Sequence, residues 1–364
     1  MSCNATLPID KIYSLYSFFC ECDIMVPPPD YTLSISEAYH EITADILMQE
    51  KSLEFLTTVT SLTDTLQGVP SWVPDYSQAY SPRLALCGAF RASLDSICPG
   101  RGTQVAAQET GGRRDYIVTA GAIVDEIKET SPFVTWPVNI STQVKDGPFM
   151  NLESHYGETV RAFRDWFELS MMTSQYPTTE ESNILSALQK TLLYTDMGGL
   201  HSGRAFSKWL GLILCIHPRY RDAFDNVDLD EMLRPARADP ELQTEFFNNP
   251  ARQHLTEIEE WKVICAAKTH PDVREIHHHI WMMSLNCTFF VTESGYMGTA
   301  PVSILQGDKI VLMPGANHPM VLRQRSSEDG SRTFAVVCAA YVHGMMNGEI
   351  WPEHSERTVA MVLV

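Results

Sequence analysis

Residues 289–349 alternate short apolar runs with turn-forming residues, and this pattern constrains the fold more than any other feature of the sequence. The apolar runs cover 289–291, 309–313, 320–322 and 333–342, and Gly, Pro, Asn and Ser separate them. Such spacing is typical of strands joined by tight turns. It predicts an antiparallel β meander or small barrel of about four strands.

Other segments predict helices around this sheet. Ser34 and Glu37 have the spacing of a capping box, in which an N-cap Ser and an N3 Glu satisfy each other's backbone donors. Apolar stripes with helical period continue through 158–215, and helices are expected again over 241–285. The β-branched run at 116–129 predicts one or two strands of the same sheet system. Helices that flank and interrupt strands indicate an α+β fold, with the meander packed against a helical block.

The whole chain, residues 1–364, is predicted to form a single unit. Residues 10–19 predict a short helix or turn, and residues 53–59 a buried strand or short helix. The expected subregions are a helical start (1–71), strands and loops (72–150), a helical block (151–285) and the meander (286–364).

Composition excludes several classes of function. The net charge of −18 disfavours nucleic-acid binding, which needs a concentrated basic face, and docking on anionic membranes. No apolar run approaches the ~20 residues of a membrane-spanning helix, and the N-terminus lacks the pattern of a secretion signal. The nine scattered cysteines are expected to be reduced thiols of a cytoplasmic protein.

No familiar catalytic or metal motif occurs in the sequence. Walker A, Gly-x-Gly-x-x-Gly, Gly-x-Ser-x-Gly and His-Glu-x-x-His patterns are all missing. The run His277-His278-His279 cannot direct all three rings at one ion from a helix, and the acidic cluster at 225–231 lacks the EF-hand glycine. We therefore predict no metal site. Cys338 with His343 is the nearest Cys/His pair, but Cys338 lies in an apolar strand and is expected to belong to the core.

Several motifs in order resemble the fungal heterokaryon-incompatibility (HET) proteins, in the region that follows their signalling domain. The motifs are Asp10-Lys11-Ile12-Tyr13, Pro29-Asp30-Tyr31 with Glu37-Ala38-Tyr39, Pro70-Ser71-Trp72-Val73-Pro74-Asp75-Tyr76-Ser77, Gly295-Tyr296-Met297-Gly298, Gly307-Asp308, Pro319-Met320-Val321-Leu322-Arg323 and the block Tyr341 to Glu349. They span nearly the whole chain. The Leu-Ser-Tyr-x-Trp-Gly segment of the family's signalling domain has no counterpart here, so cell-death signalling is not expected.

Short HET-like proteins include cyclases of fungal secondary metabolism that form a norbornene in a diterpenoid by intramolecular [4+2] cycloaddition. The resemblance therefore implies a Diels-Alderase, or pericyclase, acting on a hydrophobic terpenoid. Such a reaction needs no cofactor. It needs a surface that holds a flexible polyene in its reactive conformer and one or two donors aimed at a carbonyl.

We predict that Arg323, Tyr341 and His343 are the catalytic donors of such an enzyme. The substrate-binding residues are expected among aromatic and Met side chains at loop or strand ends: Trp72, Tyr76, Tyr296, Met297, Met345 and Met346. Arg323 has a structural alternative, an ion pair with Glu349 or Asp308. The Trp72 loop has one as well, since it could simply knit the chain to the sheet.

Two other functions remain open at this point. The first is a non-enzymatic recognition or regulatory protein derived from the HET family, which would bind a protein partner. The second is a hydrolase or transferase whose nucleophile and base meet only in space.

Overall fold

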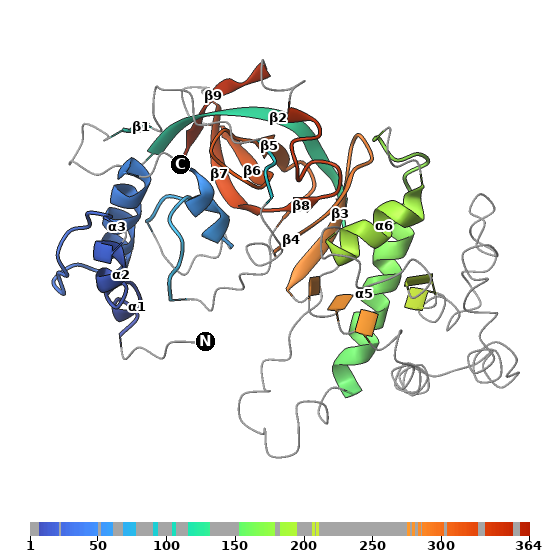
Figure 1. Cartoon of the computed structure of the whole chain (residues 1–364), viewed down its shortest axis with the longest axis horizontal. Helices are drawn as coiled ribbons and strands as arrows, with labels where there is room; N and C mark the ends of the chain where they lie inside the picture. Colours follow the sequence, from blue (N-terminus) through green and yellow to red (C-terminus); the bar gives the residue numbers. More distant parts are fainter. Residues whose placement is uncertain are drawn as a thin grey trace, which may run out of the picture. The chain divides into compact units, whose positions relative to one another are not determined.

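The computed structural model describes helices and strands over about half of the chain (Figure 1). The described residues are 7–21, 23–49, 52–60, 68–77, 90–93, 104–106, 116–131, 153–178, 183–194, 206–207, 209–210, 275–276, 279–280, 283–284, 286–301, 304–326, 332–351 and 357–364. They fall into two compact units, residues 1–130 with 290–364 and residues 131–289. The prediction of a single family unit over 1–364 stays a prediction.

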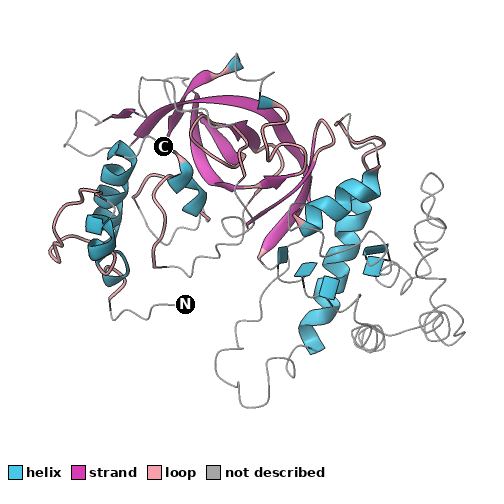
Figure 2. Ribbon diagram, viewed as in Figure 1, coloured by secondary structure: helices cyan, strands magenta, loops and turns pink. Residues whose placement is uncertain are grey.

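The first unit combines N-terminal helices with a mixed β-sheet (Figure 2). Its helices are α1 (Asp10–Tyr13), α2 (Tyr16–Glu21), α3 (Ile35–Gln49) and the 3₁₀ helix η1 (Glu54–Thr58). Its strands are β1 (Gln104–Ala106), β2 (Tyr116–Thr130), β4 (Met297–Pro301), β5 (Lys309–Leu312), β6 (Met320–Ser326), β7 (Arg332–Ala339), β8 (Tyr341–Val342) and β9 (Val359–Leu363), and β3 (Cys287–Thr292) spans the boundary between the units. The predicted α+β class is confirmed.

The predicted capping box is present at the start of α3. Ser34 Oγ accepts the Glu37 N–H at 3.2 Å, and Glu37 Oε2 accepts the Ser34 N–H at 3.0 Å. The structure also decides the two choices of secondary structure that the sequence left open for residues 10–19 and 53–59. Residues 53–59 contain a short helix, η1, and residues 10–19 contain α1 and the first part of α2.

The meander is confirmed for β5, β6 and β7, which pair in antiparallel order, but the complete sheet is not purely antiparallel. β9 pairs parallel to β7 and antiparallel to β2, and β2 also pairs with β5. These contacts close a ring of hydrogen-bonded strands, β2–β5–β6–β7–β9, without forming a regular barrel. β3, β4 and β8 continue the sheet from β2. The turn-rich stretch could not reveal β9, because that strand lies beyond it in the sequence.

The 15-residue strand β2 closes the ring by changing partners along its length. Residues 117–121 pair with β9, and residues 122–126 pair with β5. Gly121 lies at this change, and a Cβ atom there would lie 2.8 Å from Met361 Sδ and 2.9 Å from Val311 Cγ1. A glycine therefore allows the three strands to approach one another closely.

Alternating residues of the ring strands enter two apolar clusters. Val311, Leu322 and Val336 pack in one cluster with the N-terminal helices. Ile310 and Val321, their neighbours in the chain, pack in another with residues of β3 and β8. Both faces of these strands are therefore buried, which explains why their sequences read as continuous apolar runs.

The second unit contains α5 (Glu153–Met171) and α6 (Ile184–Leu193). Phe163, Trp166 and Phe167 form the buried stripe predicted for α5, and Trp166 stacks on Phe289 at a centroid distance of 5.6 Å. Most of the helices predicted over 241–285 lie outside the described residues, as do His277, His278 and the acidic cluster at 225–231. Among the described helices, none is both long and apolar enough to cross a membrane.

Candidate functional site

The predicted site residues lie in three separate places in the first unit. Arg323, on β6, makes a bidentate pair with Asp308: its Nε and Nη2 donate to Oδ1 and Oδ2, each at 2.8 Å. Asp308 Oδ2 also accepts the Leu305 N–H at 2.8 Å, and the Asp308 side chain is only 3% exposed. The hydrogen bond to Asp308 raises the pKa of Arg323 above its ordinary value. The structural alternative for Arg323, an ion pair with Asp308, is thus confirmed, and its catalytic role stays a prediction.

A second group lies around the β4–β8 pairing. Tyr341 is opposite Thr299, and the His343 N–H donates to the Met297 carbonyl at 3.0 Å. The Val342 N–H donates to Met346 Sδ at 3.3 Å. Here the structure brings together four predicted site residues: Met297, Tyr341, His343 and Met346. Met345 is buried in the neighbouring apolar cluster, against which Tyr296 packs.

The third group, Trp72 and Tyr76, packs on α3. Tyr76 Oη lies 3.0 Å from Thr43 Oγ1, its ring meets Tyr39 edge-on, and the Trp72 ring lies 5.2 Å from His40. The loop that carries them is therefore tied to the N-terminal helix. Ser71 also joins it to the sheet, as the structural alternative predicted: its N–H donates to the Val364 carbonyl at 3.0 Å, and its Oγ accepts the Val336 N–H at 2.8 Å. The substrate-binding roles predicted for Trp72 and Tyr76 stay predictions.

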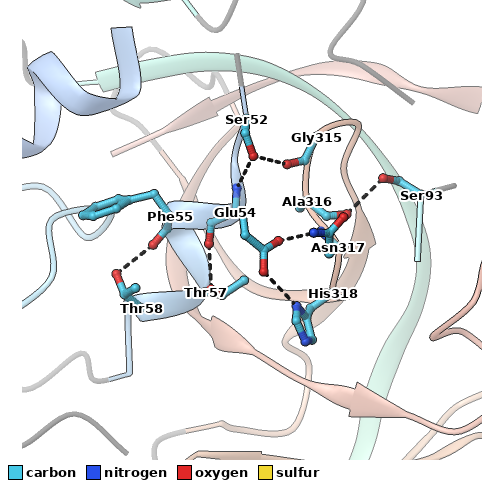
Figure 3. Close-up of polar contacts among 10 residues, drawn as sticks. All are labelled: Ser52, Glu54, Phe55, Thr57, Thr58, Ser93, Gly315, Ala316, Asn317 and His318. Atoms are coloured by element: carbon cyan, nitrogen blue, oxygen red, sulfur yellow. Dashed lines mark hydrogen bonds and ion pairs between the residues drawn. The ribbon is translucent and has the colours of Figure 1, made fainter. Parts of the chain in front are cut away.

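A polar site that no sequence pattern indicated forms where η1 meets the turn between β5 and β6 (Figure 3). Ser52 Oγ accepts the Glu54 N–H and donates to the Gly315 carbonyl, both at 3.1 Å. The Leu53 N–H donates to the same carbonyl at 2.8 Å. Gly315 has a φ of 84°, a conformation that favours glycine. The start of η1 is therefore fixed against this turn.

The Glu54 carboxylate joins the same turn through two contacts (Figure 3). Its Oε2 accepts the Asn317 N–H at 2.9 Å, and its Oε1 lies 3.4 Å from His318 Nδ1. Burial raises the pKa of Glu54, but the His318 imidazole and the Asn317 N–H outweigh that effect, so the net pKa is below its ordinary value of 4.5. The folded structure therefore favours the ionised carboxylate beside the imidazole.

Residues 90–93 cover the other side of the turn. The Ala92 N–H donates to the Asn317 carbonyl at 3.1 Å, and Ser93 Oγ donates to the Ala316 carbonyl at 2.9 Å. The Phe90 ring stands edge-on to His318 at 5.4 Å and to Tyr341 at 5.8 Å. Phe90 thus links His318 to the second group of predicted residues.

His318 is deeply buried, with 2% of its surface exposed, yet its Nε2 has no hydrogen-bond partner among the described residues. A buried nitrogen left in this way costs about 1–3 kcal/mol. If Nδ1–H faces Glu54, Nε2 of the neutral ring can accept a hydrogen bond from a ligand, and Nε2–H of the protonated ring can donate one. Nε2 of His318 can therefore serve a ligand as a hydrogen-bond acceptor when the ring is neutral. When the ring is protonated, Nε2–H can serve as a donor, and the Glu54 carboxylate stabilises the positive charge.

The sequence contained one weak signal for this site. His318 lies between Asn317 and Pro319 in the most turn-rich segment of the chain, where a histidine is not required for the turn. Nothing local pointed to Glu54, which is 263 residues from Asn317. Among the described residues, no group of three or more His, Cys, Asp or Glu side chains could hold a metal ion.

Comparison with known proteins agrees with the resemblance carried by the motifs. Residues 255–362 match the profile of the Het-6 beta-barrel domain, which covers β3 to β9 apart from the last residue. Heterokaryon incompatibility protein 6, OR allele, of Neurospora crassa is 36% identical over 61 residues, which are 17% of this chain and 9% of the relative. No solved structure matches the chain significantly.

The first unit is thus an α+β structure whose ring of strands lies within the matched Het-6 beta-barrel region, apart from β2. The resemblance carried by the motifs is thus supported for the C-terminal part of the chain, where residues 255–362 are similar to the Het-6 beta-barrel domain. The match covers under a tenth of the Neurospora protein, so the activity of that whole protein does not pass to this chain.

Proposed function

We propose that this chain is a fungal cyclase that promotes, without a cofactor, an intramolecular [4+2] cycloaddition in a hydrophobic terpenoid and forms a norbornene. One observation carries the proposal: the buried Nε2 of His318, whose ring lies beside the Glu54 carboxylate and edge-on to Phe90, which also contacts Tyr341. A carbonyl group of a bound ligand at Nε2 would give that nitrogen its missing partner.

The chemistry of a cycloaddition suits such a site. Three π bonds of the diene and dienophile become two C–C σ bonds and one new π bond, and no atom or electron leaves the substrate. The protein has to hold the reactive conformer and to withdraw electron density from the dienophile. Protonated His318 donates from Nε2 to the dienophile carbonyl, and the Glu54 carboxylate stabilises the positive charge on the ring.

The three donors predicted from the sequence differ in how well they could contact a substrate at this site. Tyr341 and His318 both contact the Phe90 ring, so Tyr341 remains a candidate for contact with the substrate. His343 follows it on the same segment. Arg323 already has both oxygens of Asp308 as partners. We assign the principal donor to His318 and keep Tyr341 and His343 as secondary candidates.

The test uses purified full-length protein and a terpenoid that carries a tethered diene and dienophile. Wild-type protein should raise the cyclisation rate and select one stereoisomer, with no added metal or cofactor. His318→Gln places an amide N–H near the position of Nε2, whereas His318→Asn keeps a donor near Nδ1 only. The rate should therefore fall in the order wild type, Gln, Asn, with Asn lowered roughly 10²-fold.

His279→Gln is the matched control for this series, because it changes a histidine of the second unit to which no role in the reaction is assigned. A rate and product ratio equal to those in buffer, across substrates of this class, would refute the cyclase. Equal rates for His318→Asn and wild type would refute the assignment of the donor while leaving the cyclase intact.

A second candidate is a recognition or regulatory protein without catalytic activity. The similarity to a protein named for heterokaryon incompatibility favours it. On this hypothesis, a terpenoid with a carbonyl group could bind at His318 without being converted. Calorimetric binding of that terpenoid with no change in its cyclisation rate would favour this candidate over the cyclase.

A further inference from the structure

Exposed apolar side chains are frequent in the N-terminal segment of the chain. Ten large apolar residues are exposed among those the structure describes, and six of them lie between residues 7 and 48. These are Leu7 (50% exposed), Leu15 (42%), Phe18 (58%), Met25 (79%), Tyr31 (61%) and Met48 (52%). Single exposed apolar residues are ordinary, but such a concentration in one short segment is typical of a binding surface.

Hydrogen bonds bring together the segments that carry four of these residues. Leu15 directly precedes α2, where its carbonyl accepts the Phe19 N–H at 2.9 Å, and Phe18 lies three residues later on the helix. The Ile24 N–H donates to the Phe19 carbonyl, so the chain turns back on α2 directly before Met25. The Met25 N–H in turn donates to Gln49 Oε1 at 2.7 Å, next to Met48 at the end of α3. We call Leu15, Phe18, Met25 and Met48 the N-terminal apolar surface.

The segment that carries this surface is strongly acidic. Residues 1–50 contain a single basic side chain, Lys11, whose Nζ donates to the Ser77 carbonyl. Their acidic side chains are Asp10, Glu21, Asp23, Asp30, Glu37, Glu41, Asp45 and Glu50. Glu21 and Asp23, which flank the turn before Met25, are both exposed. The surface therefore combines apolar side chains with a negative surround.

We propose that the N-terminal apolar surface docks a basic amphipathic helix of a partner protein. Leucine-like side chains of the partner would cover Phe18, Met25 and Met48, and its Lys or Arg residues would face Glu21 and Asp23. A second copy of this chain does not fit, because it would bring two sets of carboxylates together. An anionic membrane is disfavoured for the same reason.

The proposal is tested with a synthetic helical peptide that has Leu at i, i+3, i+4 and i+7 and Lys elsewhere. Full-length protein should bind the labelled peptide in fluorescence anisotropy, and more weakly as salt rises. A peptide with Glu in place of every Lys should not bind. Vesicles of phosphatidylserine and phosphatidylcholine should not sediment the protein.

The double variant Phe18→Ser/Met25→Ser should weaken binding of the Lys peptide at least about tenfold, because it removes the apolar contacts. Met172→Ser is the matched control, since Met172 is 65% exposed but lies after α5. Glu21→Gln/Asp23→Asn should weaken binding in low salt, and Glu168→Gln, an exposed carboxylate of α5, should not.

Three outcomes would overturn the proposal: no binding of the Lys peptide, equal binding of the Glu peptide, or equal weakening by Met172→Ser. Sedimentation with the anionic vesicles would replace a protein partner by a membrane. The exposed positions of Phe18 and Met25 make unfolding of the variant an unexpected result, and circular dichroism checks it.

Discussion

Two charged pairs of the first unit differ in how completely their polar atoms are satisfied. Arg323 and Asp308 form a bidentate pair, and a backbone N–H completes the coordination of the carboxylate. Glu54 and His318 meet through one long contact, and the more deeply buried partner keeps a nitrogen without a partner among the described residues. The first pair joins Asp308 to β6, and the second joins η1 to the turn that carries His318. Of the two pairs, the second leaves a buried polar atom, His318 Nε2, that a ligand could contact.

This difference separates a structural pair from a candidate site. Arg323 has the residue type expected of a donor to a carboxylate, and this made it attractive in the sequence. The structure shows that the donors concerned are already bound to Asp308. His318 had no motif to recommend it, yet it retains unused hydrogen-bonding capacity in a buried, aromatic setting. Unused capacity, rather than residue type, is the better guide in this chain.

The largest effect is expected from breaking the complete pair. Arg323→Ala leaves the buried Asp308 carboxylate without its cation and should lower the free energy of unfolding by about 3 kcal/mol. Urea denaturation measures the change. Arg323→Lys keeps the charge but not the bidentate geometry. Its free energy of unfolding should lie between those of wild type and Arg323→Ala. A loss below about 1 kcal/mol for the Ala variant would show that the pair is not structural.

Replacement of His318 should lower the free energy of unfolding less than replacement of Arg323. His318→Asn keeps a donor near Nδ1 and removes the buried Nε2 that lacks a partner, so we expect a loss of about 1 kcal/mol, chiefly from the space left by the ring. The same urea titration measures it. A loss as large as that of Arg323→Ala would mean that His318 is a structural residue and would erase the contrast between the pairs.

The Glu54 contact should also appear in the pH dependence of stability. Because the pKa of Glu54 is lowered from 4.5 in the folded protein, its stabilising contribution is complete above about pH 4.5 and is lost as pH falls through the folded value. Glu54→Gln should therefore lose less stability than wild type on acidification below about pH 4.5. Other carboxylates titrate there too, so the difference between the two unfolding curves is the quantity to measure. Parallel curves would contradict the contact.

The smallest effect is expected from His343→Gln. His343 is half-buried, and its backbone N–H to Met297 is kept in the variant. Its free energy of unfolding should stay within about 0.5 kcal/mol of wild type in thermal melts, as for most substitutions outside the core. A larger loss would show that the His343 side chain contributes to the stability of the fold.

Local patterns in the sequence predicted local structure well. Three-residue spacing gave the Ser34–Glu37 capping box, and turn residues gave the antiparallel order of β5, β6 and β7. The apolar stripe of α5 is buried as its period required. Each cap, turn and helical stripe depends on residues a few positions apart, so a short stretch of sequence contains the needed information. The resemblance to the HET proteins rests on several such short motifs in order.

The features that define the candidate site depend on contacts between distant segments. The parallel pairing of β7 with β9, the change of partner at Gly121, and the meeting of Glu54 with the 317–318 turn all join segments far apart in the chain. The sequence could offer Asp308 and Glu349 as partners for Arg323, but only packing selects Asp308.

The sequence by itself therefore determined the α+β class, the strands β3, β5, β6 and β7 of the closing block and the resemblance to heterokaryon-incompatibility proteins. Only the tertiary structure decided that the sheet closes through β9, that Arg323 is bound to Asp308 and that His318 keeps an unused buried nitrogen. The physical reason is that periodicity and turn chemistry act over a few residues, whereas burial and hydrogen-bond satisfaction depend on which distant segments the fold brings into contact.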